Sequence, residues 1–170
     1  MNRRPSRQTQ RGAAAVEFAL AFPMMFMLLY GLLTFGTTFY AQTVVARAVH
    51  DGARVAGLVP TPPANQPRDF TRVKTEIIES LAASVITPPG NSQTLAVRRA
   101  WLESHVRSRI TVVEAPCTGA IGGTCATIRL NFPYGNTDGT RLFPDINIPG
   151  IGGTGTWIPS ALTSKAIVRL

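Results

Sequence analysis

Glu17 is the residue whose position most demands a chemical explanation. It stands at the start of an apolar run, and no Asp, Glu, Lys or Arg occurs from Phe18 to Ala46. A charged carboxylate within a membrane costs about 3 kcal/mol or more unless it is paired, so such residues are candidates for function. Position alone leaves two interpretations: a carboxylate that is paired for assembly, or one that rests at the membrane interface near Arg11.

The other polar residues form no catalytic or metal-binding pattern. The sequence contains no nucleophile-elbow, zinc-protease, P-loop or dinucleotide motif. His50 and His105 stand far from the two cysteines, whereas a zinc site needs about four ligands at recognisable spacing. We therefore expect no enzymatic activity, no catalytic residue, no metal, no cofactor and no small-molecule substrate.

The net charge of +8 arises from 17 basic and 9 acidic residues and is unevenly distributed. Four arginines lie in the first 11 residues, and the remaining basic residues are scattered along the chain. They are not interleaved with aromatic residues as on a nucleic-acid-binding surface, so we expect no nucleic-acid partner. Basic residues mark the cytoplasmic side of a membrane helix, which predicts a cytoplasmic N-terminus. The residues that supply this signal, with no acid among them, are Arg3, Arg4, Arg7 and Arg11.

One long helix is predicted from Ala13 to Ala56. Its first part, to about Phe35, supplies the roughly 20 apolar residues that cross a bilayer core of about 30 Å. Its second part has small and apolar residues at helical spacing, and Gly57 and the following prolines end it. At about 66 Å, such a helix is roughly twice as long as an anchor requires, which predicts a spine that packs against its own domain or neighbouring copies. The predicted packing stripe is Ala41, Val45, Ala48 or Val49, Gly52 and Val55.

A cleavable secretory signal is the main alternative to a membrane anchor. Ala46-Arg47-Ala48 resembles a small-x-small cleavage site. However, the apolar run exceeds the roughly 7–15 residues usual for a signal peptide, and Glu17 interrupts its beginning. These two features favour the anchor.

An α+β fold is predicted for the whole chain: a transmembrane and spine helix over 13–57, a Pro-rich linker over 58–68, and a small extracytoplasmic domain over 69–170. The domain should contain one or two further helices, over 69–85 and about 92–106, and a small antiparallel sheet with strands over 109–114, 126–132 and 161–170. Residues 133–158 should be loop with at most short strands. Asp69 is the expected N-cap of the first of these helices. The residues expected to be buried are Phe70, Val73, Ile77, Leu81, Val85, Leu95, Leu102 and Val106, with Trp101 and Trp157 as core or interface anchors.

Cys117 and Cys125 stand close together, with three glycines between them. In an oxidising compartment such a pair predicts a local disulfide that closes a hairpin loop. Two free thiols are the alternative, because spacing alone does not establish pairing.

The segment Arg11-Gly-Ala-Ala-Ala-Val-Glu17-Phe18 resembles the processing site of type IV pilin precursors. With the following Ala-Leu-Ala-Phe-Pro, it is similar to the N-terminus of the TadE-like family, which comprises pseudopilins of the tight-adherence (Tad/Flp, type IVc) pilus systems. The similarity extends through Tyr30-Gly31 to the Ala- and Arg-rich stretch 46–56. Beyond Gly57 it is only one of general shape.

The resemblance implies a processing site and an assembly site. A prepilin peptidase would cut after Gly12, which disfavours helix and leaves its backbone accessible, and would release a basic leader over 1–12. The cut leaves a charged amine on Ala13, which Glu17 neutralises in its own chain or in an adjacent subunit. Phe18 is the neighbouring residue of the motif.

The resemblance also implies a function: a minor pilin-like subunit in the assembly of a Tad-type pilus. Such a protein spans the bacterial inner membrane once, with its C-terminal domain in the periplasm, and can be incorporated into an extracellular pilus. Its implied partners are the membrane, the prepilin peptidase, other pilin-like subunits and the inner-membrane platform of the pilus machinery. The alternative is a membrane-anchored extracytoplasmic binding module that does not polymerise.

Overall fold

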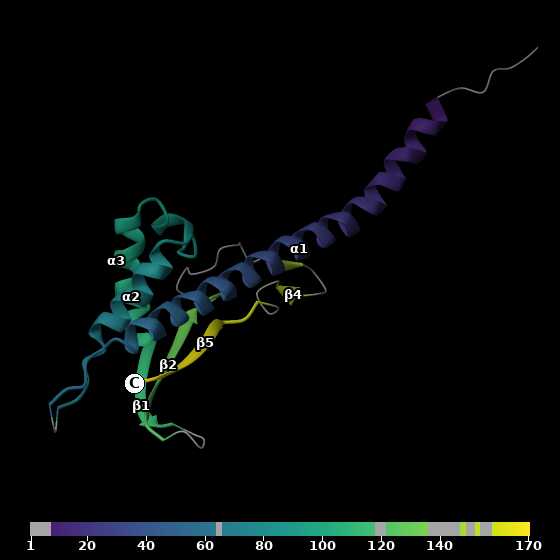
Figure 1. Cartoon of the computed structure of the whole chain (residues 1–170). Helices are drawn as coiled ribbons and strands as arrows, with labels where there is room; N and C mark the ends of the chain where they lie inside the picture. The colour runs from purple at the N-terminus through teal and green to yellow at the C-terminus, as the bar shows by residue number, and fades with distance from the viewer. Residues whose placement is uncertain (1–7, 64–65, 118–121, 136–146, 149–151, 154–157) are drawn as a thin grey trace, which may run out of the picture. The chain divides into compact units, whose positions relative to one another are not determined.

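The computed structural model describes residues 8–63, 66–117, 122–135, 147–148, 152–153 and 158–170 of the 170-residue chain. The chain forms two compact units, Met1–Thr37 and Thr38–Leu170. The predicted α+β class is confirmed (Figure 1). The elements are α1 (Gln8–Ala56), α2 (Thr71–Ala82), η1 (Pro89–Asn91), α3 (Leu95–His105), η2 (Arg107–Arg109), β1 (Ile110–Pro116), β2 (Thr124–Pro133), β3 (Asn147–Ile148), β4 (Gly152–Gly153) and β5 (Ala161–Arg169).

Helix α1 is the predicted long helix, with one difference at its beginning. It starts at Gln8 rather than Ala13, and Gly12 therefore lies inside it. The alanines at 13–15 are strong helix formers, and they offset the weak propensity of one glycine. The helix ends at Ala56 as predicted, where the Gly57 N–H still donates to the Ala53 carbonyl at 3.2 Å.

The C-terminal part of α1 provides the central stripe of the core of the second unit. The predicted spine residues are buried there at helical spacing, because a stripe of small and branched apolar residues must be covered by other elements. Gly52 marks the closest approach of α2: a Cβ atom at this position would lie 2.5 Å from Ile77 Cγ1. The buried residues of the stripe are Ala41, Val45, Ala48, Val49, Ala53 and Ala56, whereas Val55 is half-buried.

Helix α2 is shorter than predicted at both ends. Its N-cap is Phe70, so the expectation that Asp69 caps the helix is wrong. Asp69 stands one residue earlier, and its Oδ1 accepts a hydrogen bond from the Thr71 N–H at 2.8 Å. Hydrogen bonds from the Thr71 side chain and backbone lower the pKa of the Asp69 carboxyl. Val85, which was expected to be buried, lies beyond the helix end and is 57% exposed.

Helix α3 begins after Thr94, whose Oγ1 accepts a hydrogen bond from the Val97 N–H at 3.3 Å. Leu95 was expected in the core but is 51% exposed, because it occupies the first turn on the solvent side. Leu102 and Val106 are fully buried as predicted. Trp101 is also buried and stacks on the His105 ring with centroids 4.7 Å apart, whereas Trp157 lies outside the described residues.

The main sheet is antiparallel, with strand order β1-β2-β5. One face packs against the core, and β5 also contacts the α1 side directly: Gln42 Nε2 donates to the Thr163 carbonyl at 3.1 Å. The side chains of the other face alternate toward solvent, as the two-residue period of a strand requires. The residues on the buried face are Ile110, Ala126, Ile128, Leu130, Phe132, Leu162 and Ala166. Strands β3 and β4 form a separate two-stranded pair, which agrees with the expectation of short strands in this region.

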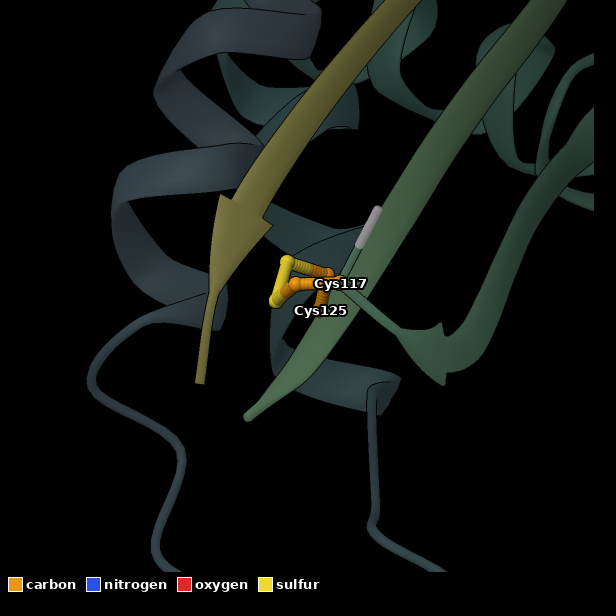
Figure 2. The surroundings of a disulfide bond; sticks show 2 residues. All are labelled: Cys117 and Cys125. Carbon is orange, nitrogen blue, oxygen red and sulfur yellow. A yellow bond between two sulfur atoms is a disulfide. The ribbon is translucent and has the colours of Figure 1, made fainter. Parts of the chain in front are cut away.

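The predicted disulfide is present at the β1–β2 hairpin. Cys117 directly follows β1, Cys125 lies near the start of β2, and their Cα atoms are 5.0 Å apart (Figure 2). The Cys117 N–H donates to the Gly123 carbonyl at 2.9 Å, which tightens the same turn. Gly123 has a φ of 130°, a backbone conformation that a residue with a Cβ rarely adopts.

Candidate processing and assembly site

The predicted processing and assembly residues lie on consecutive turns of α1 in the first unit. Ala13 and Glu17 are separated by one turn, about 6 Å along the helix axis. Both side chains are exposed, as is that of Phe18. A Cβ atom at Gly12 would meet nothing within 4 Å, so no other part of the described chain covers this position. Its backbone, however, lies inside α1, so a peptidase that needs an extended substrate would have to unwind this first part of the helix.

Phe18 begins an aromatic ladder, defined here as Phe18, Phe22, Phe26 and Tyr30. Successive ring centroids lie 5.4, 6.2 and 6.3 Å apart. This ladder was not predicted, although its signal in the sequence is plain: four aromatic residues at four-residue spacing stack along one side of a helix. Phe26 stands two and a half turns after Glu17 and therefore leaves α1 on the opposite side, whereas Phe18 is only about 100° around the helix from the carboxylate.

The hydroxyl groups that follow the ladder are satisfied within the helix. Thr34 Oγ1 donates to the Tyr30 carbonyl at 2.8 Å. Thr37 Oγ1 lies 3.0 Å from the Leu33 carbonyl and 2.9 Å from the Thr34 carbonyl. Such internal pairing is what polar groups require where water is absent. It makes this part of α1 compatible with a lipid environment.

By length and composition, one helix of the described residues is a candidate membrane span. It covers Gly12–Ala56, and its most apolar window has a mean hydropathy of 2.0. None of that window is buried within the chain, unlike the core helix of a soluble protein. The many large apolar side chains therefore need a cover that the chain itself does not supply.

Residues 12–54 match the TadE-like protein family. The predicted resemblance is therefore confirmed over this segment, which lies entirely within α1. The match indicates a protein associated with the Tad pilus, and the family is one of pilus components rather than of enzymes. No curated protein matches the chain, and no solved structure matches it.

The position of the TadE-like segment in the fold bears on the alternative of a cleaved secretory signal. A cut after Ala48 would remove Ala41, Val45 and Ala48 itself, all with 0% exposure. Burial stabilises a domain by up to about 1.5–3 kcal/mol for a valine side chain and by about 0.8 kcal/mol for one methylene-sized group such as the alanine methyl. A chain trimmed there would lose the first half of the buried stripe of its own core, which argues against that cleavage site.

The second unit has hollows on its surface but no chemical constellation within them. Among the residues that the structure describes, no three His, Cys, Asp or Glu side chains gather as a metal site would require. A hollow of about 390 Å³ contains Arg68 and Arg107, but both are paired with acids. Arg68 Nε lies 3.0 Å from Glu114 Oε1, and Arg107 Nη1 lies 2.8 Å from Glu103 Oε2. The two arginines are thus neutralised, and Lys74 and Asp69, which have opposite charges, also line the hollow.

Proposed function

We propose that this chain is a minor pilin-like subunit (pseudopilin) in the assembly of a Tad-type pilus. The observation that carries the proposal is the TadE-like match, which begins at Gly12, the residue after which the resemblance implies cleavage. The exposure of the apolar helix that follows adds support. In a subunit of this kind, lipid covers the helix before assembly and other subunits cover it in the filament. The role is structural, with no catalytic step assigned to any residue.

The proposed organisation follows the chain from its N-terminus. Residues 1–12 are a basic leader that remains in the cytoplasm, and 13–57 form the transmembrane and spine helix. Residues 58–68 are a linker, and 69–170 form a periplasmic domain. The proposed partners are the inner membrane, the prepilin peptidase, other pilin-like subunits and the inner-membrane platform of the pilus machinery.

The proposed assembly chemistry is a charge pair. Removal of the leader leaves an ammonium group on Ala13, and Glu17 is the nearest acid along the chain. A pair formed between subunits sets their register, because a subunit docked out of step leaves one charge unpaired in an apolar environment. A pair formed within one chain would neutralise the same two groups before assembly.

The decisive experiment is mass spectrometry of the N-terminus of the membrane-extracted protein. We expect a chain that begins at Ala13 in cells that contain the peptidase. Gly12→Phe should leave the precursor untrimmed, because a large side chain blocks the cleavage site. Gly36→Phe is the matched control, since a Cβ there also meets nothing within 4 Å, and it should be trimmed normally.

Two results would contradict the proposal. An intact Met1 N-terminus in peptidase-containing cells would favour the alternative of an anchored binding module that does not polymerise. An N-terminus near Val49 would instead restore the secretory-signal interpretation.

A further inference from the structure

The outward face of the main sheet carries basic residues that the strand register brings together. Arg129 on β2 stands directly opposite Lys165 on β5, and Arg169 stands opposite Cys125 further along the same strands. All three basic side chains are exposed. We call these residues, with Val113 and Ile167 between them, the cationic sheet face.

No acid balances this face among the residues that the structure describes. Glu114 on β1 points to the other side of the sheet, where it pairs with Arg68. Like charges directly opposite each other on neighbouring strands destabilise a sheet. The Arg129–Lys165 pair therefore opposes folding, and such local conflicts are expected where a surface serves binding.

The cationic sheet face also has a central row, called here the aliphatic row, in which the aliphatic side chains of Val113 and Ile167 stand on either side of Thr127. Val113, Thr127 and Ile167 are register partners across β1, β2 and β5. Val113 is 56% exposed and Ile167 is 58% exposed. Rows on one face are two residues apart, about 7 Å along the strands. The aliphatic row is thus flanked by Arg129 and Lys165 on one side and by Arg169 on the other.

We propose that this face docks an acidic protein surface with an aliphatic centre, presented by a protein other than a second copy of this chain. A purely electrostatic ligand would gain nothing from the exposed aliphatic row, whereas a protein surface covers both features at once. A second copy is a poor partner, because the chain is basic even without Arg3, Arg4, Arg7 and Arg11 (13 basic against 9 acidic residues) and its described acids are largely engaged. The engaged acids are Asp51 with Ser80, Glu79 with Arg99, Glu103 with Arg107, and Glu114 with Arg68.

This inference goes beyond the proposed function and does not depend on cleavage at Gly12. It is tested with the full chain in neutral detergent micelles and three soluble probes. The probes are a peptide of alternating Glu and Leu, a duplex DNA oligomer and a short-chain phosphatidylglycerol. We expect the peptide to bind most tightly, with an affinity that falls as salt is added.

Charge substitutions locate the binding surface. Neutralising Arg129, Lys165 and Arg169 to Gln should weaken peptide binding about tenfold, as expected for the loss of three exposed ion pairs. The matched control neutralises Arg47, Arg54 and Arg72, which are exposed on α1 and α2. It removes the same charge and should change the affinity less than threefold.

The aliphatic row has its own test. Val113→Thr with Ile167→Thr should weaken the Glu-Leu peptide about fivefold and leave a Glu-Ser peptide unaffected. The variant with Arg129, Lys165 and Arg169 replaced by Gln should unfold at the same denaturant concentration as wild type or a higher one, because the Arg129–Lys165 repulsion is removed. An equal loss of peptide affinity in the sheet-face triple variant and in the control triple variant would overturn the proposal. So would tighter binding of the DNA or the phospholipid at this face, or a fall in stability that accounts for the lost binding.

Discussion

Glu17 illustrates how one side chain can separate membrane insertion from assembly. Helices that associate within a bilayer gain little from hydrophobic transfer, because lipid is already apolar. Polar contacts must then provide much of the selectivity of docking. The later rings of the aromatic ladder, Phe22 to Tyr30, point away from Glu17 on α1, so a neighbour that pairs with Glu17 leaves them available for a different contact.

The prediction at this scale concerns assembly by Glu17 variants. Glu17→Ala should be inserted and trimmed but should fail to assemble, because the Ala13 ammonium loses its partner. An unpaired buried charge costs about 3–5 kcal/mol. Glu17→Gln, which keeps the shape, should fail equally, and Glu17→Asp should be intermediate because its reach is shorter. The measurement is pilus formation together with co-purification of other pilin-like subunits.

The outcome is informative in either direction. If trimmed Glu17→Ala assembled as well as wild type, the proposed Ala13–Glu17 charge pair would be wrong. Glu17 would then be a carboxylate that only rests at the membrane interface. Such a result would not contradict the proposed membrane helix or the proposed processing site.

At the scale of elements, Gly52 governs how closely α2 approaches α1. Gly52→Ala should lower the free energy of unfolding, because the new methyl group would overlap the buried Ile77 side chain. Overpacking of a core costs about 1–3 kcal/mol, and the better helix propensity of alanine returns at most about 1 kcal/mol. Denaturant unfolding in detergent, followed by tryptophan fluorescence, measures the difference.

Gly36→Ala is the control for this prediction, since a Cβ at Gly36 meets nothing within 4 Å on the same helix. It should leave the unfolding midpoint of the second unit unchanged. If both variants behaved alike, close packing at Gly52 would not be the cause.

A second element-scale prediction concerns the β1–β2 hairpin. Replacing both Cys117 and Cys125 by serine should lower the free energy of unfolding by about 2–3 kcal/mol, because the bond limits the unfolded chain even across a short loop. A reducing agent should lower the stability of the wild type by a similar amount and leave the serine variant unchanged. Labelling of both free thiols in unreduced native protein would contradict the disulfide.

Most elements follow from local sequence patterns. The end of α1 is fixed by Gly57, and the buried spine by helical spacing from Ala41 onward. The errors lie at helix ends: Val85 and Leu95 continue the apolar pattern of α2 and α3, but the helix boundaries place them in solvent. The spacing of apolar residues alone does not determine where a helix begins or ends, or whether an apolar residue at its end lies against the core.

The two candidate sites differ in how far the sequence alone could predict them. The proposed processing and assembly residues, Gly12 to Phe18, form one contiguous motif, so the sequence alone is enough to propose them. The cationic sheet face was missed because its members come from strands far apart in the chain. Arg129 and Lys165 meet only through the β2–β5 register, which depends on tertiary packing.

At the scale of the whole molecule, the asymmetric charge of the two ends of the span predicts its orientation. The second unit should be digested by protease added to spheroplasts, while an N-terminal tag on the untrimmed Gly12→Phe precursor should be protected. Replacing Arg3, Arg4, Arg7 and Arg11 by glutamine should reduce the fraction of chains in this orientation, because the arginines that hold the N-terminus inside are gone. A second unit that is protected in wild-type spheroplasts would contradict the assignment.

The order of the strands has a consequence for how the protein is made. Strand β2 is the central strand of the main sheet. In the sequence, β1 ends at Pro116, shortly before β2 begins at Thr124, whereas β5 begins only at Ala161. While the polypeptide is being synthesised, the β1–β2 hairpin is therefore complete before β5 exists, and one edge of β2 stays open. Open strand edges recruit foreign strands and promote aggregation. The Cys117–Cys125 bond is local to the hairpin, so its formation does not require β5. Once formed, it fixes the β1–β2 register, whereas the open edge of β2 is covered only when β5 pairs with it.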